Sequence, residues 1–355
     1  MRVGIITFTE GYNYGNKLQN YALLTFLSNH IGQDVCTICN KVHHGSYLNN
    51  FITNIKRMIP SKKHFAYMKR QARFNNFNKA YLNITKRPLT SNTKSFKDID
   101  CFVCGSDQIW NPNYYKNIDP LVGKFKDNKP SISYAASFGV SEIPESLRKS
   151  YAESISSLKA ISVREQQGKI ICANLGIEGV EVNVDPTMLL SKSEWELLIK
   201  EPYIKPKNKY VLTYYLGNIP IDVEHCIQKY CINNDCERID LNSTDSLDYF
   251  VLNPQEFLYM IYNSEIVFTD SFHASVFSII FKKKFLVSSR VIAEKEKMNS
   301  RIESLLDLFE LQHHKFEGFS GDFAQLLIDE ESIDSVLEAE RSHSALYFRN
   351  NLQLI

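Results

Sequence analysis

The chain has 355 residues and a formal net charge of +1, with 44% hydrophobic and 23% charged residues. This is the composition of an ordinary globular protein, and the length favours two domains over one core. Met1-Arg2 leads directly into a short apolar run, which excludes a secretory signal peptide, and no apolar run reaches the roughly 20 residues of a spanning helix. We therefore expect a cytoplasmic protein.

The charges are distributed unevenly along the chain. Residues 35–97 contain no Asp or Glu but thirteen Lys and Arg, which leaves 41 − 13 = 28 basic against 40 acidic residues elsewhere. Aromatic residues interleave with these charges, and Pro60 divides the segment into two predicted helices. The aromatic residues are Phe51, Phe65, Tyr67, Phe74, Phe77 and Tyr81.

Two interpretations of this basic segment are open. The first is a pair of solvated helices with one aromatic face packed on a sheet. The second is a basic amphipathic surface that contacts an anionic membrane or a diphosphate-bearing substrate. Nucleic acid is not an expected partner, because the sequence has neither a recognised binding motif nor overall basicity.

Two cysteine pairs have the CxxC spacing, Cys36–Cys39 and Cys101–Cys104. Both pairs lie in predicted strands, where residues i and i+3 point to opposite faces and cannot share a metal. Zinc ligand pairs normally lie on turns, so we predict buried reduced thiols and no metal site.

The first half of the chain alternates predicted strands and helices. The strands are 3–8, 35–39, 101–104, 131–135, 160–163 and 180–184, and the helices are 17–29 and 146–158. The turn after the first strand, residues 9–16, lacks GxGxxG, so we do not expect binding of a nicotinamide dinucleotide. A charged stretch with Pro202 and Pro206 predicts the domain boundary.

The second half repeats the same alternation. Strands are predicted at 210–216, 237–241, 266–268 and 284–288, helices at 221–233, 254–262, 274–281 and 299–308, and a loop at 290–298. We predict two Rossmann-like, doubly wound α/β domains that face a crevice, as in GT-B-type transferases: 1–200 with the basic insert at about 45–95, and 208–325. An acidic helix in 326–355 is predicted to pack back on the first domain.

The turns that follow three predicted strands hold candidate site residues. Gly105–Pro112 places Asp107 for acid–base chemistry or sugar hydroxyls and Trp110 for sugar stacking, although a helix cap and core packing are the structural alternatives. Arg164 ends the strand at 160–163 and suits a phosphate or carboxylate, with a salt bridge to Glu165 as the alternative.

The stretch from Ser264 to Phe285 predicts a strand, a tight polar turn and a buried helix. Free N–H groups and the helix dipole at such a start favour an anion. Ser271 or Asp270 is expected to cap the helix. His273, predicted to face solvent beside the cap, suits anion binding or proton transfer near neutral pH.

Seven stretches together resemble the polysaccharide pyruvyl transferase family. They are Asn13-Tyr14-Gly15-Asn16-Lys17-Leu18-Gln19 with Tyr21-Ala22-Leu23; Val103-Cys104-Gly105-Ser106-Asp107-Gln108-Ile109-Trp110-Asn111; Tyr134-Ala135-Ala136-Ser137-Phe138-Gly139; Ser162-Val163-Arg164-Glu165; Val184-Asp185-Pro186-Thr187; Thr269-Asp270-Ser271-Phe272-His273; and Asn299-Ser300-Arg301-Ile302. The resemblance extends from the first strand to about residue 310. The basic segment at 45–95 and the last 45 residues contribute nothing to it.

The resemblance implies a GT-B-like enzyme that attaches pyruvate from phosphoenolpyruvate, as a cyclic ketal, to two hydroxyls of a sugar. The acceptor would be a sugar of a capsular or other surface polysaccharide precursor. A lipid-linked oligosaccharide acceptor at the inner face of a bacterial membrane would also explain the basic segment at 45–95. Phosphoenolpyruvate is a co-substrate, and no cofactor or metal is implied. The catalytic residues implied are His273 and Asp107. The donor ligands are Arg164, Ser271, Phe272, His273, Ala274 and Arg301, and the acceptor ligands are Asn13, Gly15, Asn16, Lys17, Gln19, Ser106, Asp107, Gln108 and Trp110.

The sequence departs from the family pattern at Ser271. Relatives have Arg-x-His where this chain has Ser271-Phe272-His273. Losing one charge-assisted hydrogen bond costs roughly 1.5–3 kcal/mol, so we expect another cation to compensate. The candidates, in order of preference, are Arg164, Arg301, Arg290, Lys282 and Lys17.

Two alternative functions fit the same architecture. A nucleotide-sugar glycosyltransferase would need a carboxylate for the ribose, for which Glu256 and Glu265 are the available residues. A carbohydrate-binding protein that has lost the chemistry would explain the missing Arg, whereas the presence of His273, Arg164 and Asp107 argues against it.

Overall fold

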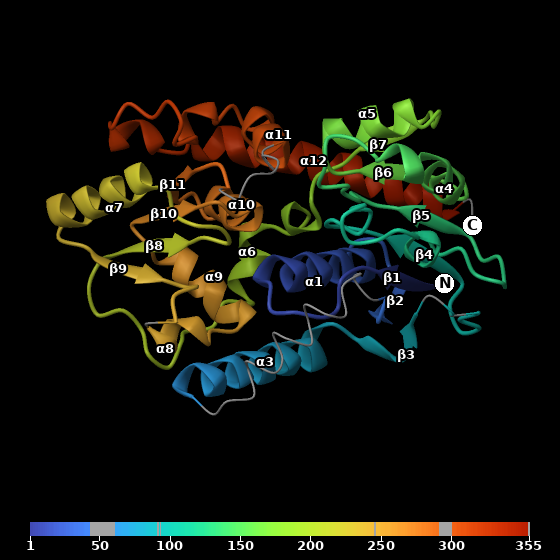
Figure 1. Ribbon diagram of the computed structural model, residues 1–355, viewed down its shortest axis with the longest axis horizontal. Helices are drawn as coiled ribbons and strands as arrows, with labels where there is room; N and C mark the ends of the chain where they lie inside the picture. The colour runs from blue at the N-terminus through green and yellow to red at the C-terminus, as the bar shows by residue number, and fades with distance from the viewer. Residues whose placement is uncertain (43–60, 91, 93, 245, 291–299, 354–355) are drawn as a thin grey trace. The chain divides into compact units, whose positions relative to one another are not determined.

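The computed structural model describes residues 1–42, 61–90, 92, 94–244, 246–290 and 300–353. The predicted helix before Pro60 and most of the predicted loop at 290–298 lie outside these residues. The chain forms two units, which are described separately (Figure 1). Unit 1 comprises residues 1–56, 76–190 and 338–355, and unit 2 comprises residues 57–75 and 191–337.

Unit 1 is built on a parallel sheet. Its elements are β1 (Arg2–Ile6), α1 (Tyr14–Asn29), β2 (Asp34–Asn40), β3 (Ile84–Leu89), β4 (Cys101–Cys104), β5 (Ser131–Ser133), α4 (Glu145–Ile155), β6 (Ile161–Val163), α5 (Gln166–Asn174) and β7 (Val180–Val182). Five strands follow the order β3-β2-β1-β4-β5, and β6 pairs with β7. A parallel bridge from Ala136 to Val163 joins the two groups.

This order places a topological switch point between β1 and β4. Chain connections leave β1 toward β2 on one side and arrive at β4 on the other, so the loops after β1 and β4 diverge at the carboxyl edge. Ligands of open parallel sheets bind at such points. The strands are apolar because both faces are covered: four residues of β1 and all four of β4 are buried.

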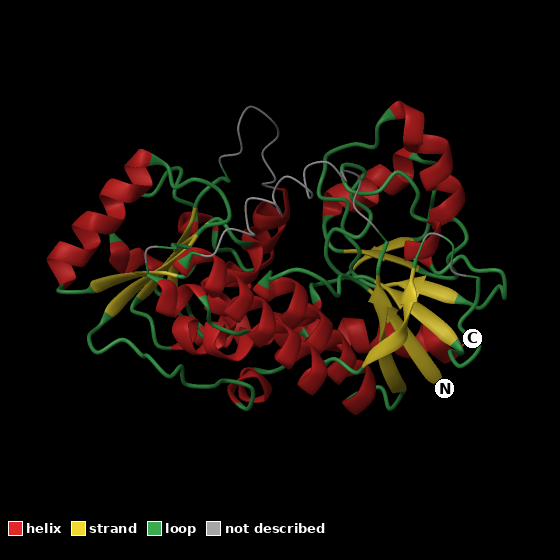
Figure 2. Cartoon of the chain, turned by 60° about the horizontal axis from the view of Figure 1, so that its bottom comes forward, coloured by secondary structure: helices red, strands yellow, loops and turns green. Residues whose placement is uncertain are grey.

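Unit 2 has a second parallel sheet, with the order β11-β10-β8-β9. Its elements are α6 (Lys192–Glu196), β8 (Tyr210–Tyr214), α7 (Ile221–Asn234), β9 (Glu237–Asp240), α8 (Leu247–Phe250), α9 (Pro254–Tyr262), β10 (Ile266–Thr269), α10 (Phe272–Ile280), β11 (Lys284–Val287) and α11 (Ser300–Leu308). The switch point of this sheet lies between β8 and β10. The helices and strands of both units are distinguished by colour in Figure 2.

Two helices have residues in both units. The first turns of α12 (Glu330–Gln353) belong to unit 2, and the helix from Glu338 onward belongs to unit 1, where Tyr134 donates to Ser344 Oγ. The helix α3 (Lys62–Tyr81) belongs to unit 2 as far as Asn75. The N-terminal half of the helix described in the basic insert therefore packs with unit 2, whereas the insert was predicted within the N-terminal domain.

The predicted fold class, α/β with two parallel sheets, is confirmed. The crevice between the domains stays a prediction. Two local predictions differ from the structure. α1 begins at Tyr14 instead of Lys17, because the side chain of Asn13 caps the helix by accepting the Asn16 N–H. The strand β3 was missed because Lys86, Arg87 and Pro88 make it polar, which an edge strand tolerates.

Candidate functional site

Asp270 forms hydrogen bonds with the loops at the switch point of the unit 2 sheet. It follows β10, and its carboxylate accepts the N–H groups of Leu216 at 2.7 Å and Gly217 at 2.8 Å, both just after β8. Arg290, three residues after β11, donates from Nε to Asp270 Oδ2 at 3.0 Å and from Nη2 to the Asp270 carbonyl at 3.1 Å. One buried carboxylate thus joins the loops that follow three neighbouring strands.

The start of α10 lies next to this carboxylate. Ser271 is the N-cap: its side chain accepts the Ala274 N–H at 3.4 Å, and its own N–H donates to Thr269 Oγ1 at 2.9 Å. The cap predicted at Ser271 or Asp270 is therefore Ser271. The helix start contributes positive potential, and the Arg290 guanidinium, bonded to the residue before the cap, adds a formal charge beside it.

His273 lies in the first turn of α10 and is buried, with its ring edge-on to Phe272 at 5.3 Å. The prediction that His273 faces solvent is wrong. Every residue of α10 is buried, so the helix has no exposed face to present. The imidazole of His273 is therefore surrounded by protein at the start of α10, whereas the sequence predicted an imidazole exposed to solvent.

The other cations predicted for unit 2 occupy different positions. Arg301 is buried on α11, which packs against α10. Lys282 follows the far end of α10 and pairs with Asp334 on α12. The hydrogen bonds of Arg290 to Asp270 place its guanidinium at the start of α10.

A buried charge cluster surrounds Arg164 in unit 1. The Arg164 Nη1 donates to Asp185 Oδ2 at 2.7 Å, and its other nitrogens lie 3.6 Å from Asp107 Oδ1 and 3.7 Å from Glu165 Oε2. Burial lowers the pKa of the guanidinium, but Asp185, Asp107 and Glu165 raise it more, so Arg164 remains charged. Three carboxylates already compensate this cation, which argues against the predicted role of Arg164 as a donor ligand.

Asp107 is held in an unusual backbone conformation at the switch point of unit 1. Its φ of 67° is in the left-handed region, which a non-glycine residue adopts at a cost of about 1–3 kcal/mol. Its Oδ1 accepts the N–H of Gln108 at 2.9 Å, and no helix begins there. The helix-cap alternative is therefore wrong, and the carboxylate is fixed by its own turn.

Gly105 and Ser106 connect β4 to this turn. Gly105 has φ 140°, and a Cβ there would lie 2.0 Å from the Tyr134 carbonyl oxygen, so the position requires glycine. Ser106 Oγ lies 3.0 Å from the Ala135 carbonyl and 3.1 Å from Asp185 Oδ2. Ser106 is fully buried, and its hydroxyl links the β4 loop to the Arg164 cluster.

Lys17 and Gln19 were predicted to bind the acceptor, and the burial and internal hydrogen bonds of both side chains argue against that role. Lys17 is fully buried and donates to the Thr9 carbonyl at 2.6 Å and the Glu10 carbonyl at 3.3 Å, so its ammonium supports the loop after β1. Burial lowers the pKa of this amine to about 8. Gln19 is also fully buried; it donates to Thr7 Oγ1 and accepts the Ser106 N–H.

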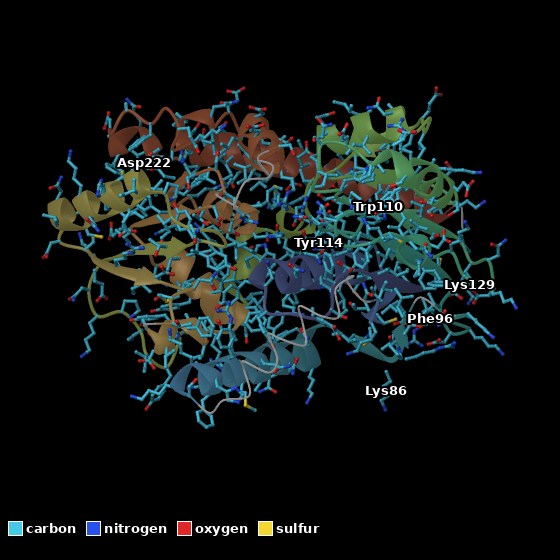
Figure 3. The ribbon with its side chains drawn as sticks, viewed as in Figure 1. Lys86, Phe96, Trp110, Tyr114, Lys129 and Asp222 are labelled. Atoms are coloured by element: carbon cyan, nitrogen blue, oxygen red, sulfur yellow. The ribbon has the colours of Figure 1, made fainter. Side chains whose placement is uncertain are left out.

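Trp110 was predicted either to stack on a sugar or to pack in the core, and in the structure it packs in the core. Its side chain is fully buried in the core of unit 1, with its ring 5.4 Å from that of Phe138 (Figure 3). Gln108 is buried and accepts from Asn111 at 2.7 Å, and Gly15 is buried in the first turn of α1. Of the predicted acceptor residues, Asn13 and Asn16 are partly exposed.

The cysteines are all free thiols, and burial raises the pKa of Cys101 to about 12. Within the described residues, no group of three or more His, Cys, Asp or Glu side chains could hold a metal ion.

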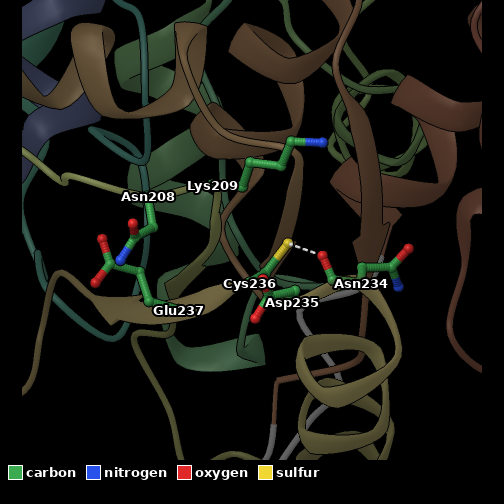
Figure 4. Close-up of a pocket in the computed structure, with 6 residues that line it drawn as sticks. All are labelled: Asn208, Lys209, Asn234, Asp235, Cys236 and Glu237. Atoms are coloured by element: carbon green, nitrogen blue, oxygen red, sulfur yellow. Dashed lines mark hydrogen bonds between the residues drawn. The ribbon is translucent and has the colours of Figure 1, made fainter.

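A pocket of about 620 Å³ lies elsewhere in unit 2, at the amino ends of β8 and β9 (Figure 4). It is lined by Asn208, Lys209, Asn234, Asp235, Cys236 and Glu237. These residues lie at the edge of the sheet opposite Asp270 and α10, so this pocket is not the predicted ligand site.

The two carboxylates predicted for a nucleotide ribose do not suit that role. Glu256 is buried; it completes the capping box of α9 and pairs with Arg73 on α3. Glu265 precedes β10, at the amino edge of the sheet. Neither side chain is presented at the edge where ligands of parallel sheets bind.

Sequence reasoning did not anticipate the roles of Asp270 and Asp185. Both residues had been noted, Asp270 as a possible cap and Asp185 within a motif. Each lies within three residues of the end of a parallel strand, as Asp107 does, and this shared position was the available signal. Their long-range partners are 20 to 79 residues away, and only the folded sheet brings them together.

Each unit has a parallel sheet with charged side chains at its switch point. These features define a two-unit α/β protein of the class that binds small ligands in the loops at the carboxyl ends of the strands. Residues 13–290 match the sequence profile of the polysaccharide pyruvyl transferase family. The chain belongs to this family, and hence to a family of transferases. No curated protein matches the chain.

Several solved structures resemble the chain weakly. The UDP-GlcNAc 2-epimerase of Methanocaldococcus jannaschii is 10% identical with a TM-score of 0.46, over 96% of this chain and 99% of that one. The UDP-GlcNAc 2-epimerase of Neisseria meningitidis is 11% identical with a TM-score of 0.41, over 98% and 100%. The Escherichia coli ADP-heptose LPS heptosyltransferase II is 10% identical with a TM-score of 0.36, over 96% and 99%.

Proposed function

We propose that this protein transfers pyruvate from phosphoenolpyruvate to two hydroxyls of a sugar in a surface polysaccharide precursor, forming a cyclic ketal. Membership of the polysaccharide pyruvyl transferase family supports the reaction class. The observation that supports the donor most directly is the position of Arg290, held by Asp270 at the start of α10. Family membership implies a polysaccharide acceptor. The sugar that is modified and the carrier of the precursor are part of the proposal.

The donor is a small anion with a phosphate and a carboxylate. The start of α10 supplies oriented N–H groups and dipole, and Arg290 supplies a full positive charge beside them. Arg290 thereby compensates for Ser271, which stands where relatives have Arg. Arg301, on the neighbouring helix α11, is the second cation that we assign to the donor.

The chemistry requires one proton to be delivered to the donor and one proton to be removed from each of the two sugar hydroxyls. A proton added to the methylene carbon gives an oxocarbenium-like centre at the adjacent carbon. One sugar hydroxyl attacks this centre and loses its proton, phosphate leaves, and the second hydroxyl closes the ring and gives its proton to the released phosphate. We assign proton delivery or phosphate binding to His273, and orientation or deprotonation of the sugar to Asp107. General acid–base groups of this kind contribute roughly 10²–10⁴-fold each.

The direct test of the donor site is calorimetric binding of phosphoenolpyruvate to the wild type, His273→Ala, Arg290→Ala and Lys282→Ala. Lys282 is a matched control, because it is a cation at the far end of the same helix with a carboxylate partner of its own. We expect at least tenfold weaker binding for the first two variants, which is about 1.4 kcal/mol, and no change for Lys282→Ala. Unchanged binding in Arg290→Ala would remove Arg290 from the donor site.

Donor and acceptor roles can be separated by enzymology. An Asp107→Asn variant should bind phosphoenolpyruvate with the affinity of the wild type but form the ketal at least a hundredfold more slowly. Absence of phosphate release with every polysaccharide precursor tested, despite donor binding, would support the non-catalytic alternative. Binding of nucleotide sugars in place of phosphoenolpyruvate would contradict the proposal altogether.

A further inference from the structure

One face of α3 packs against unit 2. Ala66 and Phe74 are buried, and the Tyr67 ring contacts that of Phe250 at 4.9 Å. The Arg70 guanidinium lies over the same Phe250 ring at 4.6 Å and donates to the Phe250 carbonyl. This face agrees with the first interpretation of the basic segment, in which a helix packs through its aromatic residues. The packing fixes the orientation of the rest of α3.

A second apolar stripe on α3 is exposed. Phe65 is 63% exposed and Met68 is 55% exposed, and Ala72, one turn further on, is exposed as well. At about 100° per residue, these three positions occupy a single stripe that does not overlap the arc of Ala66, Arg70 and Phe74. Core packing therefore does not explain Phe65 and Met68.

Lysines accompany the exposed stripe. Lys62 and Lys69 lie on the same side of the helix, within roughly 120° of Met68, and Lys63 is exposed at the helix start. α3 has no acidic residue in its 20 positions, and the chain has none between residues 35 and 97. The face defined by Lys62, Phe65, Met68 and Lys69, called the basic face below, is therefore positively charged with apolar side chains between the charges.

We propose that the basic face of α3 docks on the surface of an anionic lipid bilayer. Lysine ammonium groups would contact anionic headgroups, while Phe65 and Met68 would insert at the boundary between headgroups and acyl chains. A soluble phosphate would account for the lysines alone, but it would leave the two large apolar side chains without a role. None of the described helices is both long and apolar enough to cross the bilayer, so the attachment is peripheral.

The proposal does not depend on the reaction proposed above, and its test uses the full chain with vesicles. Wild type should sediment with vesicles containing about one-third anionic phospholipid and remain in solution with purely zwitterionic vesicles at 0.1 M salt. The double variant Lys62→Glu, Lys69→Glu should lose at least tenfold in partitioning, since each lysine near an anionic surface contributes roughly a fivefold factor. Phe65→Ser with Met68→Ser should lose about tenfold while keeping every charge.

Two matched controls separate position from net charge and exposure. Lys116→Glu, Lys169→Glu makes the same change in net charge at exposed lysines of unit 1. Ile170→Ser with Ile232→Ser removes two exposed apolar side chains elsewhere. Both controls should partition within about twofold of the wild type, and circular dichroism should show all variants folded.

Several outcomes would overturn the proposal. One is equal sedimentation of the wild type with anionic and zwitterionic vesicles, and another is unchanged binding of both α3 variants. Release from vesicles by millimolar pyrophosphate, but not by sodium chloride of equal ionic strength, would identify a phosphate site instead. A dimer in sedimentation velocity that Phe65→Ser with Met68→Ser dissociates, without any vesicle binding, would identify a second copy of the chain as the occupant.

Discussion

The carboxyl edges of the two sheets differ in the balance of positive and negative groups. In unit 1, Arg164 faces three buried carboxylates, and the Lys17 ammonium is bonded to backbone carbonyls. In unit 2, the Arg290 guanidinium and the start of α10 meet a single carboxylate, Asp270. The edge of unit 1 is thus rich in negative charge and the edge of unit 2 is suited to an anion.

This difference matches the two substrates of the proposed reaction. An anionic donor needs fixed positive charge and oriented N–H groups, which we propose that α10 and Arg290 supply. A sugar hydroxyl needs a carboxylate that accepts its proton, the role proposed for Asp107. The comparison can be tested by removing the charged groups of each edge in turn.

The largest effect is expected for Arg164→Met. Removing the guanidinium leaves Asp185, Asp107 and Glu165 buried without their cation, and breaking a buried pair in this way costs about 3–5 kcal/mol. Urea unfolding at pH 7 measures the loss in the free energy of unfolding. Arg148→Met, at a partly exposed arginine, is the control and should change it by about 0.5 kcal/mol or less. A cost below 1 kcal/mol for Arg164→Met would contradict the buried cluster.

Lys17→Met should change how stability depends on pH. The folded state lowers the pKa of Lys17 to about 8 from its ordinary 10.5, so between these values the unfolded chain binds the proton and the folded protein does not. The contribution of Lys17 to stability therefore rises with pH across this window, by about 3 kcal/mol in total. The difference in unfolding free energy between wild type and Lys17→Met, followed from pH 7.5 to pH 10, should show that rise. A constant difference would mean that the amine is not buried as described.

Arg290→Ala should lower the free energy of unfolding by less than Arg164→Met does. Asp270 loses a partly buried guanidinium but keeps the N–H groups of Leu216 and Gly217, so we expect about 1.5–3 kcal/mol. Arg290→Lys, which keeps the charge but not the pair of hydrogen bonds, should recover part of this loss. If Arg290→Ala proved as destabilising as Arg164→Met, the two edges would not differ in the way described.

The smallest effect is expected at the α10 cap. Ser271→Ala removes the acceptor of the Ala274 N–H and should cost about 1 kcal/mol, whereas Ser271→Asp should keep the cap. Phosphoenolpyruvate binding should weaken more in Ser271→Asp than in Ser271→Ala, because the added carboxylate repels the donor. The opposite order would place the anion away from the start of α10.

The sequence by itself predicted most of the architecture. Continuous apolar runs predicted nearly all the parallel strands, and the alternation with helices predicted two sheets, because a buried parallel strand must be apolar on both faces. The family was recognisable from short motifs that lie directly after strands, where loop geometry leaves little freedom of residue type. The edge strand β3 was missed because its polar residues follow no such rule.

Tertiary structure alone decided which charged side chains compensate one another. Lys17, Gln19, Trp110 and His273 all looked suitable for ligands, yet each is buried once the helices pack on the sheets. Arg164 and Arg290 are both Arg residues near strand ends, and only the fold shows that Arg164 lies among three carboxylates whereas Arg290 pairs with Asp270 alone, at a helix start. Such pairs depend on residues far apart in the chain, and no local pattern encodes which partner the fold will bring near.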